Sequence, residues 1–155
     1  FLGKLAGYNS GSKSNVLYID NTSTETPLIF GNFASNKVGI NTNMLPTTVG
    51  GVNISAYSLF VKGGILTEEV RVKTGWADYV FNDAYALKPL NEVEAYIKEN
   101  KHLPNVPSAK EVENNGLEIG DITRIQQEKI EELTLYIIKL QKQVNALEQK
   151  IDSKN

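Results

Sequence analysis

Few residues of this sequence could carry out chemistry, and they do not form a recognised catalytic or metal-binding pattern. His102 is the only histidine and cysteine is absent, so one chain cannot supply a multi-histidine or thiolate metal site. We interpret His102 as a hydrogen-bonded loop histidine, with a threefold ring of His102 side chains as the alternative. Neighbouring carboxylates are predicted to be solvated charges on exposed faces, without the raised pKa that general acid catalysis requires. These carboxylates are Glu68-Glu69, Glu111/Glu113 and Glu131-Glu132.

Two further segments contain groups that bind ions or phosphates in other proteins. The run from Asp20 to Glu25 offers oxygen ligands but lacks the glycine and the spacing of a calcium-binding loop, so we predict a polar turn. The glycines of Gly3-Lys4-Leu5-Ala6-Gly7 match neither a phosphate-binding loop nor a dinucleotide fingerprint. The sequence therefore predicts a protein that is not an enzyme, with no catalytic residues, no metal and no cofactor.

Composition narrows the class of protein. The 155 residues suffice for one ordinary domain or two small modules, and 41% apolar residues argue against disorder throughout. A net charge of −2 without a basic block does not favour nucleic acid or an anionic membrane as a partner, and no stretch is apolar enough to span a bilayer. Because the chain begins with Phe1 and shows no signal peptide, we expect it to be the C-terminal piece of a longer chain.

The most regular pattern lies in residues 119–155, which predict one long helix. From Ile130 onward aliphatic residues recur at alternating steps of three and four, with β-branched residues at every a position and Leu at every d position. This pattern predicts a parallel coiled coil, and a helix packed on its own domain is the alternative. Upstream, an eleven-residue stutter places Gln126 in the seam. The predicted seam consists of Ile119, Ile122, Gln126, Ile130, Leu133, Ile137, Leu140, Val144, Leu147 and Ile151.

Residues 1–64 show strand and turn chemistry, after a Gly-, Ser- and Asn-rich start that resembles a flexible linker. Strands this short bury little apolar surface within one chain. We therefore predict that identical chains wind around a shared axis, as in a trimeric β-helix or β-prism, with Gly39 allowing close approach of the backbone. The predicted strands are Val16–Ile19, Pro27–Phe33, Lys37–Asn41 and Asn53–Lys62.

Residues 65–118 predict a small module of strands and helices. Two strands are expected within 65–82, the second of which carries Trp76, Tyr79 and Phe81. We interpret these rings as the core of the module, and a ligand platform is the alternative. Two short helices follow, and Asp121 is expected to cap the long helix. The short helices are Glu92–Asn100, capped by Asn91, and Ala109–Asn115, between the capping box of Ser108 and Glu111 and the terminating Gly116.

Two apolar residues of the long helix, Leu135 and Ile138, lie outside the seam, and we expect segment 76–118 to cover them. Together the patterns predict an α+β protein with a β-rich segment (1–64), a small α+β module (65–118) and a coiled-coil oligomerisation helix (119–155).

Several separated motifs resemble a C-terminal module of secreted and tail-fibre-like proteins of Bacteroidetes. They are Gly75–Phe81 (GWADYVF), His102–Val112 (HLPNVPSAKEV), Asn115–Leu117 (NGL) and Lys129–Tyr136 (KIEELTLY), and the resemblance covers roughly residues 59–150. The segments Leu17–Asn21, Pro27–Gly31 and Val38–Asn41 are similar to the β repeats of trimeric phage tail fibres and adhesin heads. More distantly, the module looks like the intramolecular chaperone of phage tailspikes, whose self-cleavage uses a serine with a nearby lysine. We do not match that cleavage motif here.

The resemblance implies a trimer, whereas β-branched a and Leu d positions in a parallel coil favour two strands. We predict three, because the β-rich segment needs a threefold core. The predicted function is non-enzymatic: a module that trimerises and registers a secreted cell-surface or phage-tail-like fibre. One alternative is an adhesin tip that binds a glycan or surface protein. Another is a recognition region for outer-membrane secretion or surface anchoring.

Overall fold

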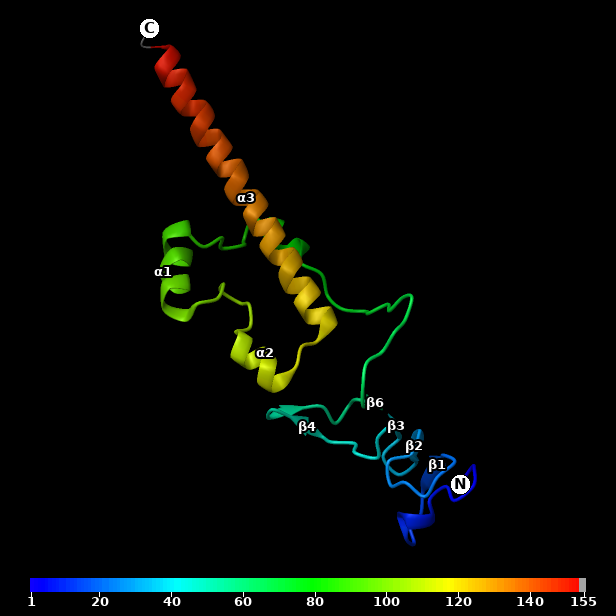
Figure 1. The fold of residues 1–155 in the computed structure, drawn as a ribbon. Helices are drawn as coiled ribbons and strands as arrows, with labels where there is room; N and C mark the ends of the chain where they lie inside the picture. The colour runs from blue at the N-terminus through cyan, green and yellow to red at the C-terminus, as the bar shows by residue number, and fades with distance from the viewer. Residues whose placement is uncertain (154–155) are drawn as a thin grey trace. The chain divides into compact units, whose positions relative to one another are not determined.

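The computed structural model of the protein describes residues 1–153, so the last two residues of the expected segment 119–155 lie outside the described residues. The chain forms two compact units, Phe1–Val70 and Arg71–Asn155 (Figure 1). Strands occupy the first unit and the long helices the second, so the α+β class is confirmed. The division after Val70 leaves most of the expected 65–118 module in the same unit as the long helix.

The first unit contains a four-stranded sheet in the order β1-β2-β3-β6 and a separate β4-β5 hairpin. Neighbouring strands run antiparallel from β1 to β3, and β6 joins β3 in parallel. The expected strand Asn53–Lys62 is wrong as a single element, because a turn at Ser55–Ala56 separates two short strands. The strands are β1 (Val16–Ile19), β2 (Ile29–Asn32), β3 (Lys37–Ile40), β4 (Thr48–Val49), β5 (Val52–Asn53) and β6 (Leu59–Val61).

A small aromatic core lies on the sheet of this unit. Tyr18 and Phe30 are cross-strand partners, both buried, and their rings meet edge to face with centroids 5.2 Å apart. Such pairs contribute to sheet stability beyond the area that they bury. Phe1 extends the cluster with its ring centroid 5.5 Å from that of Tyr18, and the expected linker contains the short 3-10 helix η1 (Tyr8–Ser10). The start of the chain is thus part of the fold.

Two positions of the sheet show how its backbone is constrained. A Cβ atom at Gly39 would lie 2.2 Å from the carbonyl oxygen of Thr42, so close approach requires glycine there within a single chain. At the end of β1, the Asp20 carboxylate accepts hydrogen bonds from the backbone N–H and hydroxyl of Thr22 and from the N–H of Leu28. These bonds, those of Thr22 first, lower the pKa of Asp20. The segment is the polar turn that we predicted.

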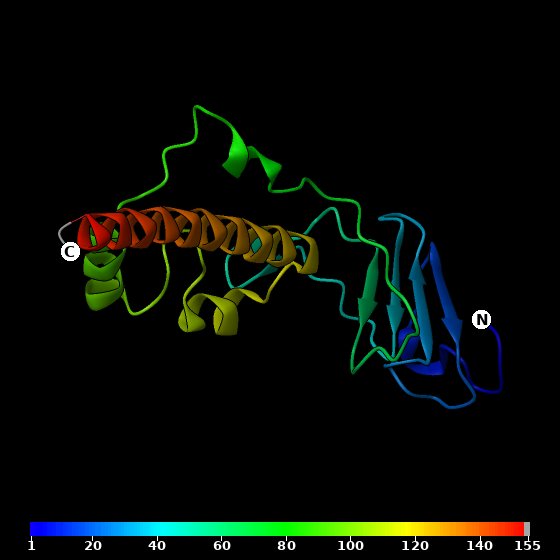
Figure 2. The same cartoon turned by 90° about the horizontal axis from the view of Figure 1, so that it is seen from above.

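Within residues 71–153, the second unit contains three α-helices and the 3-10 helix η2 (Asp78–Phe81). The α-helices are α1 (Leu90–Asn100), α2 (Ala109–Asn115) and α3 (Ile119–Asp152). The capping box of Ser108 and Glu111 is confirmed, and α2 ends at Gly116 with φ +77°. Figure 2 shows α3 as one continuous helix.

Two predicted helix caps are wrong. Helix α1 begins two residues earlier than expected, at Leu90 with Pro89 as its N-cap, so Asn91 is not the cap. Proline is tolerated at this N-cap, where the backbone is still extended (φ −59°, ψ 142°) and no helical N–H is needed. Helix α3 begins before Asp121, which therefore lies in the first turn and pairs with Arg124 across 2.6 Å.

The strands expected within 65–82 are also wrong, since these residues form extended loop and η2. Residues three apart lie on one side of a 3-10 helix, and here Ala77 and Val80 are the pair that becomes buried. The alternating pattern that indicated a strand instead reflects one small and one branched side chain facing α3, with larger rings left outside.

Candidate functional site: the two faces of helix α3

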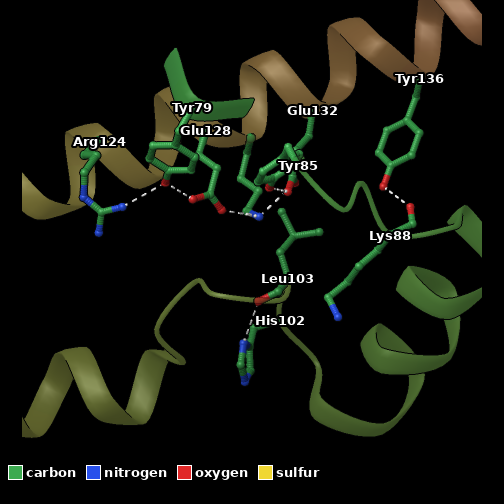
Figure 3. A network of polar contacts seen from close by, with 10 residues as sticks. Tyr79, Tyr85, Lys88, His102, Leu103, Arg124, Glu128, Glu132 and Tyr136 are labelled. Carbon is green, nitrogen blue, oxygen red and sulfur yellow. Dashed lines mark hydrogen bonds and ion pairs between the residues drawn. The ribbon is translucent and has the colours of Figure 1, made fainter. Parts of the chain in front are cut away.

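Helix α3 is the element on which the candidate site is built. No Pro or Gly interrupts it after Gly120, and its 34 residues make a helix about 50 Å long. Its first half carries the packed segments of the second unit on one side (Figure 3). We call the side that carries Ile125, Glu128, Lys129, Glu131 and Glu132 the body face. We call the side that carries the predicted heptad residues from Ile130 to Ile151 the seam face.

The body face is polar yet buried. Glu128 and Glu131 are only 5% and 4% exposed, comparable to the neighbouring aliphatic side chain of Ile125. Val80 of η2 and Ala77, the N-cap residue before it, are almost completely buried as well. Charged groups in such a place require partners, because removal from water penalises an unpaired charge heavily.

Those partners begin with Tyr79 of η2. Its hydroxyl donates a hydrogen bond to the Glu128 carboxylate and accepts one from Arg124 Nη1 at 3.1 Å (Figure 3). Arg124 in turn holds Asp121 through a hydrogen bond of 2.6 Å. Tyr79 is in this way connected to three successive turns of α3, directly at Glu128 and Arg124 and through Arg124 at Asp121.

The contacts continue along α3 through Lys129. Its ammonium lies 2.8 Å from Glu128 Oε1 and 2.8 Å from Glu132 Oε2, and all three side chains are largely removed from solvent. The Tyr85 hydroxyl donates to the other oxygen of Glu132. One turn further, Tyr136 donates to the carbonyl oxygen of Lys88. We call the connected side chains Tyr79, Tyr85, Arg124, Glu128, Lys129 and Glu132 the polar network.

The pKa values of the network follow from these contacts. Burial opposes the charged form of Glu128, but the Lys129 ammonium and the Tyr79 hydroxyl outweigh burial and lower its pKa. Burial likewise opposes the charge of Lys129, and its two carboxylate neighbours nevertheless raise its pKa. The pKa of Tyr79 is raised, first by its bond to Glu128, and that of Tyr85 is raised by burial and by its bond to Glu132. At neutral pH Lys129 and Glu128 are therefore charged, and both phenols are protonated.

The expectation of solvated carboxylates at Glu131-Glu132 is wrong. Glu131 is buried and accepts a hydrogen bond from Gln127 Nε2 at 2.9 Å, while its Oε2 atom has no hydrogen-bond partner among the described residues. The heptad pattern assigns such positions to solvent, whereas Tyr85 of the same chain bonds to Glu132 and Glu131 is buried. Glu111 also differs from a free charge, because it accepts the hydrogen bonds of the capping box.

The seam face shows the opposite combination of apolar composition and exposure. From Ile130 to Ile151 its seven aliphatic side chains are each between 46% and 64% exposed. Upstream, Ile119 and the polar Gln126 are exposed and Ile122 is half-buried. The alternative in which this helix buries its heptad row against its own domain does not occur in the described structure. The seam residues are Ile130, Leu133, Ile137, Leu140, Val144, Leu147 and Ile151.

Segment 76–118 covers the two off-seam residues unequally. Leu135 is half-buried, as expected for a residue beside the body face. Ile138 is 46% exposed, so the expectation that its own module covers it is wrong. The reason is rotational, because Ile138 lies on the far side of the helix from Tyr136 and the loop that this tyrosine holds.

The aromatic residues of the module do not form its core. Trp76, Tyr79 and Phe81 are 52%, 40% and 56% exposed, so the interpretation of a buried aromatic core is wrong for the single chain. Only Tyr79 has a polar role, through the network. The three rings remain candidates for contact with a ligand or another chain.

His102 and possible ligand sites complete the description of this unit. His102 Nδ1 lies 3.0 Å from the carbonyl oxygen of Leu103, and its ring meets the edge of Tyr96, as in the predicted loop histidine. Within residues 1–153, no group of three or more His, Cys, Asp or Glu side chains is placed to hold a metal ion. A cavity of about 300 Å³ lies beside α3, with Leu90, Leu103 and Leu133 among its lining residues.

Sequence reasoning missed the polar network. The available signal was Lys129 between two glutamates at positions 128 and 132, because side chains four apart share a helix face. The pattern did not indicate that Tyr79 and Tyr85 are the partners of these glutamates, because the tyrosines lie 49 and 47 residues away in sequence. Contacts between residues so far apart in sequence produce no periodic pattern from which they could be predicted.

Comparison with protein-family models, with curated proteins and with solved structures found no match to this chain. Across the part of the chain that the structure describes, no helix combines the length and apolar content needed to cross a membrane. The site must therefore be interpreted from its own geometry.

Proposed function

We propose that this chain is a non-enzymatic structural module that joins identical copies through α3 and sets their register in a fibre. The observation that supports it most directly is the exposed seam face: seven aliphatic side chains in strict heptad spacing, each about half exposed. An apolar row of this length is stable in water only when it is covered. Copies of the same helix provide a cover with matching spacing.

The number of copies is proposed to be three. The body face occupies one side of α3, and the free arc includes the seam as well as Thr134 and Ile138 beside it. A free arc wider than positions a and d favours contact with two neighbours rather than one. The β-branched a and Leu d residues favour two strands, so the arc and the seam composition make opposite predictions.

The same interface would help the β-rich unit. Its strands are two to four residues long, and several large apolar side chains of this unit, such as Leu28, Phe33 and Met44, are mostly exposed. Holding chains together at α3 raises the local concentration of their β units, which makes further pairing effectively intramolecular. The motifs at 75–81 and 102–112 support a secreted cell-surface or phage-tail-like fibre as the setting.

A charge-matched pair of double variants tests the proposal. Leu140→Asp with Leu147→Asp places two carboxylates in the seam, beyond the part of α3 that carries the body face. Asn145→Asp with Gln149→Asp adds the same charge to the same stretch of helix but outside the seam. Sedimentation equilibrium should give a trimer for the parent chain and the control, and a monomer for the Leu variant.

Two results would contradict the proposal. A parent chain that sediments as a monomer at concentrations of tens of micromolar would remove self-association altogether. Identical oligomers for the Leu variant and its control would show that the chains associate through another surface. A dimeric parent would retain the interface and correct only the number of copies.

One observation favours a second candidate function, that of a binding module. Trp76 and Phe81 are both more than half exposed on the second unit. Exposed aromatic rings are common contacts for glycans and protein partners. Trp76 is the only tryptophan of the chain, so its fluorescence reports any ligand that covers it. Saturable quenching or shift during titration with glycans, lost in Phe81→Ala, would support this function over a purely structural one.

A further inference from the structure

Helix α1 presents an apolar stripe that its own unit covers only in part. No residue of α1 is buried, although the helix carries Leu90, Val93 and Ile97 at helical spacing. Leu90, Ile97 and the nearby Leu103 are between 39% and 48% exposed. We call residues 89–104, which include α1 and the turn after it, the arm.

The arm does not pack tightly on α3 of its own chain. A cavity of about 300 Å³ is lined by Leu90, Val93 and Leu103 of the arm and by Leu133 and Tyr136 of α3. A second hollow of about 270 Å³ continues from Leu90 towards Leu140. The Tyr136 hydroxyl, bonded to the carbonyl oxygen of Lys88, holds the start of the arm at this height of the helix (Figure 3).

Leu133 connects this cavity with the seam, because its side chain belongs to both. Any helix that covers Leu133 in a coiled coil therefore lies at the edge of the cavity. The cavity is also bordered by Lys129 and Tyr136, which occupy the g positions beside the seam. The helix that covers the seam at Leu133 is therefore the element that can also enter the cavity.

In a parallel coiled coil, the g side of one helix faces the e side of the next. The neighbour therefore turns Thr134, at position e, and Ile138, at the adjacent b position, towards the arm. In register, Ile138 of the neighbour lies about 3 Å along the axis from the level of Tyr136 and the same distance from Leu140. These residues mark the height of the two hollows.

Ile138 is itself an apolar side chain without a cover in its own chain, 46% exposed and outside the seam. We infer that the arm of one copy packs against the Ile138 side of α3 in the neighbouring copy, and that this neighbouring helix fills the cavity beside Leu133. This inference rests on the proposed self-association and adds a second contact to it, between α1 and α3 of different copies. Each copy then both gives an arm and receives one.

Cysteine cross-linking tests which chain the arm contacts. The chain contains no cysteine, so Leu90→Cys with Ile138→Cys introduces the only two thiols. A short bismaleimide joins thiols that are close together, and denaturing electrophoresis then separates linked chains. The matched control is Leu90→Cys with Asn145→Cys, because position 145 lies on the same side of α3 about 10 Å further along.

We expect the Leu90/Ile138 variant to give covalently linked oligomers, several-fold more than the control gives. A linked monomer would show that the arm reaches Ile138 of its own chain and would overturn the inference. Equal oligomer yields in variant and control, or no linkage in either, would also overturn it, because the arm would then have no preferred contact at Ile138.

Sedimentation of the same unlinked variants separates the two levels of the proposal. Oligomers without preferential linkage at Ile138 contradict the arm contact and leave the seam intact. Monomers contradict both. A further variant, Ile138→Ser, should leave the number of copies unchanged while lowering the linkage of Leu90→Cys to a thiol at Thr134→Cys by several-fold.

Discussion

The two faces of α3 reverse the usual relation between polarity and burial. On the body face, Glu128 and Glu131 are buried, and on the seam face Leu133 and Ile137 are exposed. On the body face the charges of the polar network have partners from the same unit, and Glu131 accepts a hydrogen bond from Gln127. The aliphatic row of the seam face has no cover among the described residues. The comparison shows that a residue type predicts burial only together with the partner available to it.

The two faces also differ in what they specify. Paired buried charges contribute little net stability compared with apolar residues, but they strongly disfavour alternative packing that would leave one of them alone. The polar network therefore favours one docking position of segment 76–88 on α3. The seam face, with uniform aliphatic residues, offers more free energy from burial but tolerates more than one number of chains.

The largest expected effect on the free energy of unfolding comes from removing the Lys129 ammonium, which Glu128 and Glu132 share. Lys129→Met leaves two carboxylates buried beside each other without a counter-charge, and such a change costs about 3–5 kcal/mol. Lys142→Met on the exposed part of α3 is the control and should be close to neutral. Urea unfolding followed by far-UV circular dichroism at a fixed chain concentration measures both variants. Equal midpoints would show that the polar network does not hold the unit together.

A smaller effect is expected when one partner is removed but no charge is left alone. Tyr79→Phe deletes the hydroxyl that donates to Glu128 and keeps the ring in place. The carboxylate loses one of its hydrogen bonds, at a cost of about 1–3 kcal/mol. Tyr8→Phe, on an exposed residue of the first unit, is the control. The same urea titration applies, and a cost as large as that of Lys129→Met would mean that the tyrosine rather than the cation dominates.

The smallest expected effect is on how the free energy of unfolding depends on pH in acid. Because the pKa of Glu128 is lowered in the folded protein, the unfolded chain binds more protons between the two pKa values. The stability from Glu128 is therefore present above its unfolded pKa of about 4.3 and is lost as pH falls through the folded pKa. Glu128→Gln should flatten the acid limb of unfolding free energy against pH, and Glu148→Gln should leave it unchanged. If the free energy of unfolding of both variants fell with the same slope in acid, Glu128 would not be the group responsible.

Periodicity predicted those parts of the fold that depend on local sequence. The first strand, the capping box at Ser108 and the continuous final helix appear where the pattern placed them. The heptad row on one face of the final helix could be predicted because its spacing is a property of the local sequence. The strand expected around Tyr79 was wrong because a short 3-10 helix and a strand both direct successive side chains to different sides over so few residues.

The body face could not be predicted for a different reason. Glu128, Lys129 and Glu132 have the composition of a solvated coiled-coil flank, and their burial depends on two tyrosines far away in sequence. The same applies to Ile138, whose exposure follows from where the loop at Lys88 meets the helix. Long-range contacts of single residues decide both cases.

The exposed seam face also has a consequence for handling the protein. Under the proposed self-association, a chain separated from its copies by dilution would present an aliphatic strip along much of a helix about 50 Å long. Surfaces of this kind promote precipitation and adsorption to vessel walls. Preparations that remain concentrated throughout should therefore yield more soluble protein than those that pass through a dilute step.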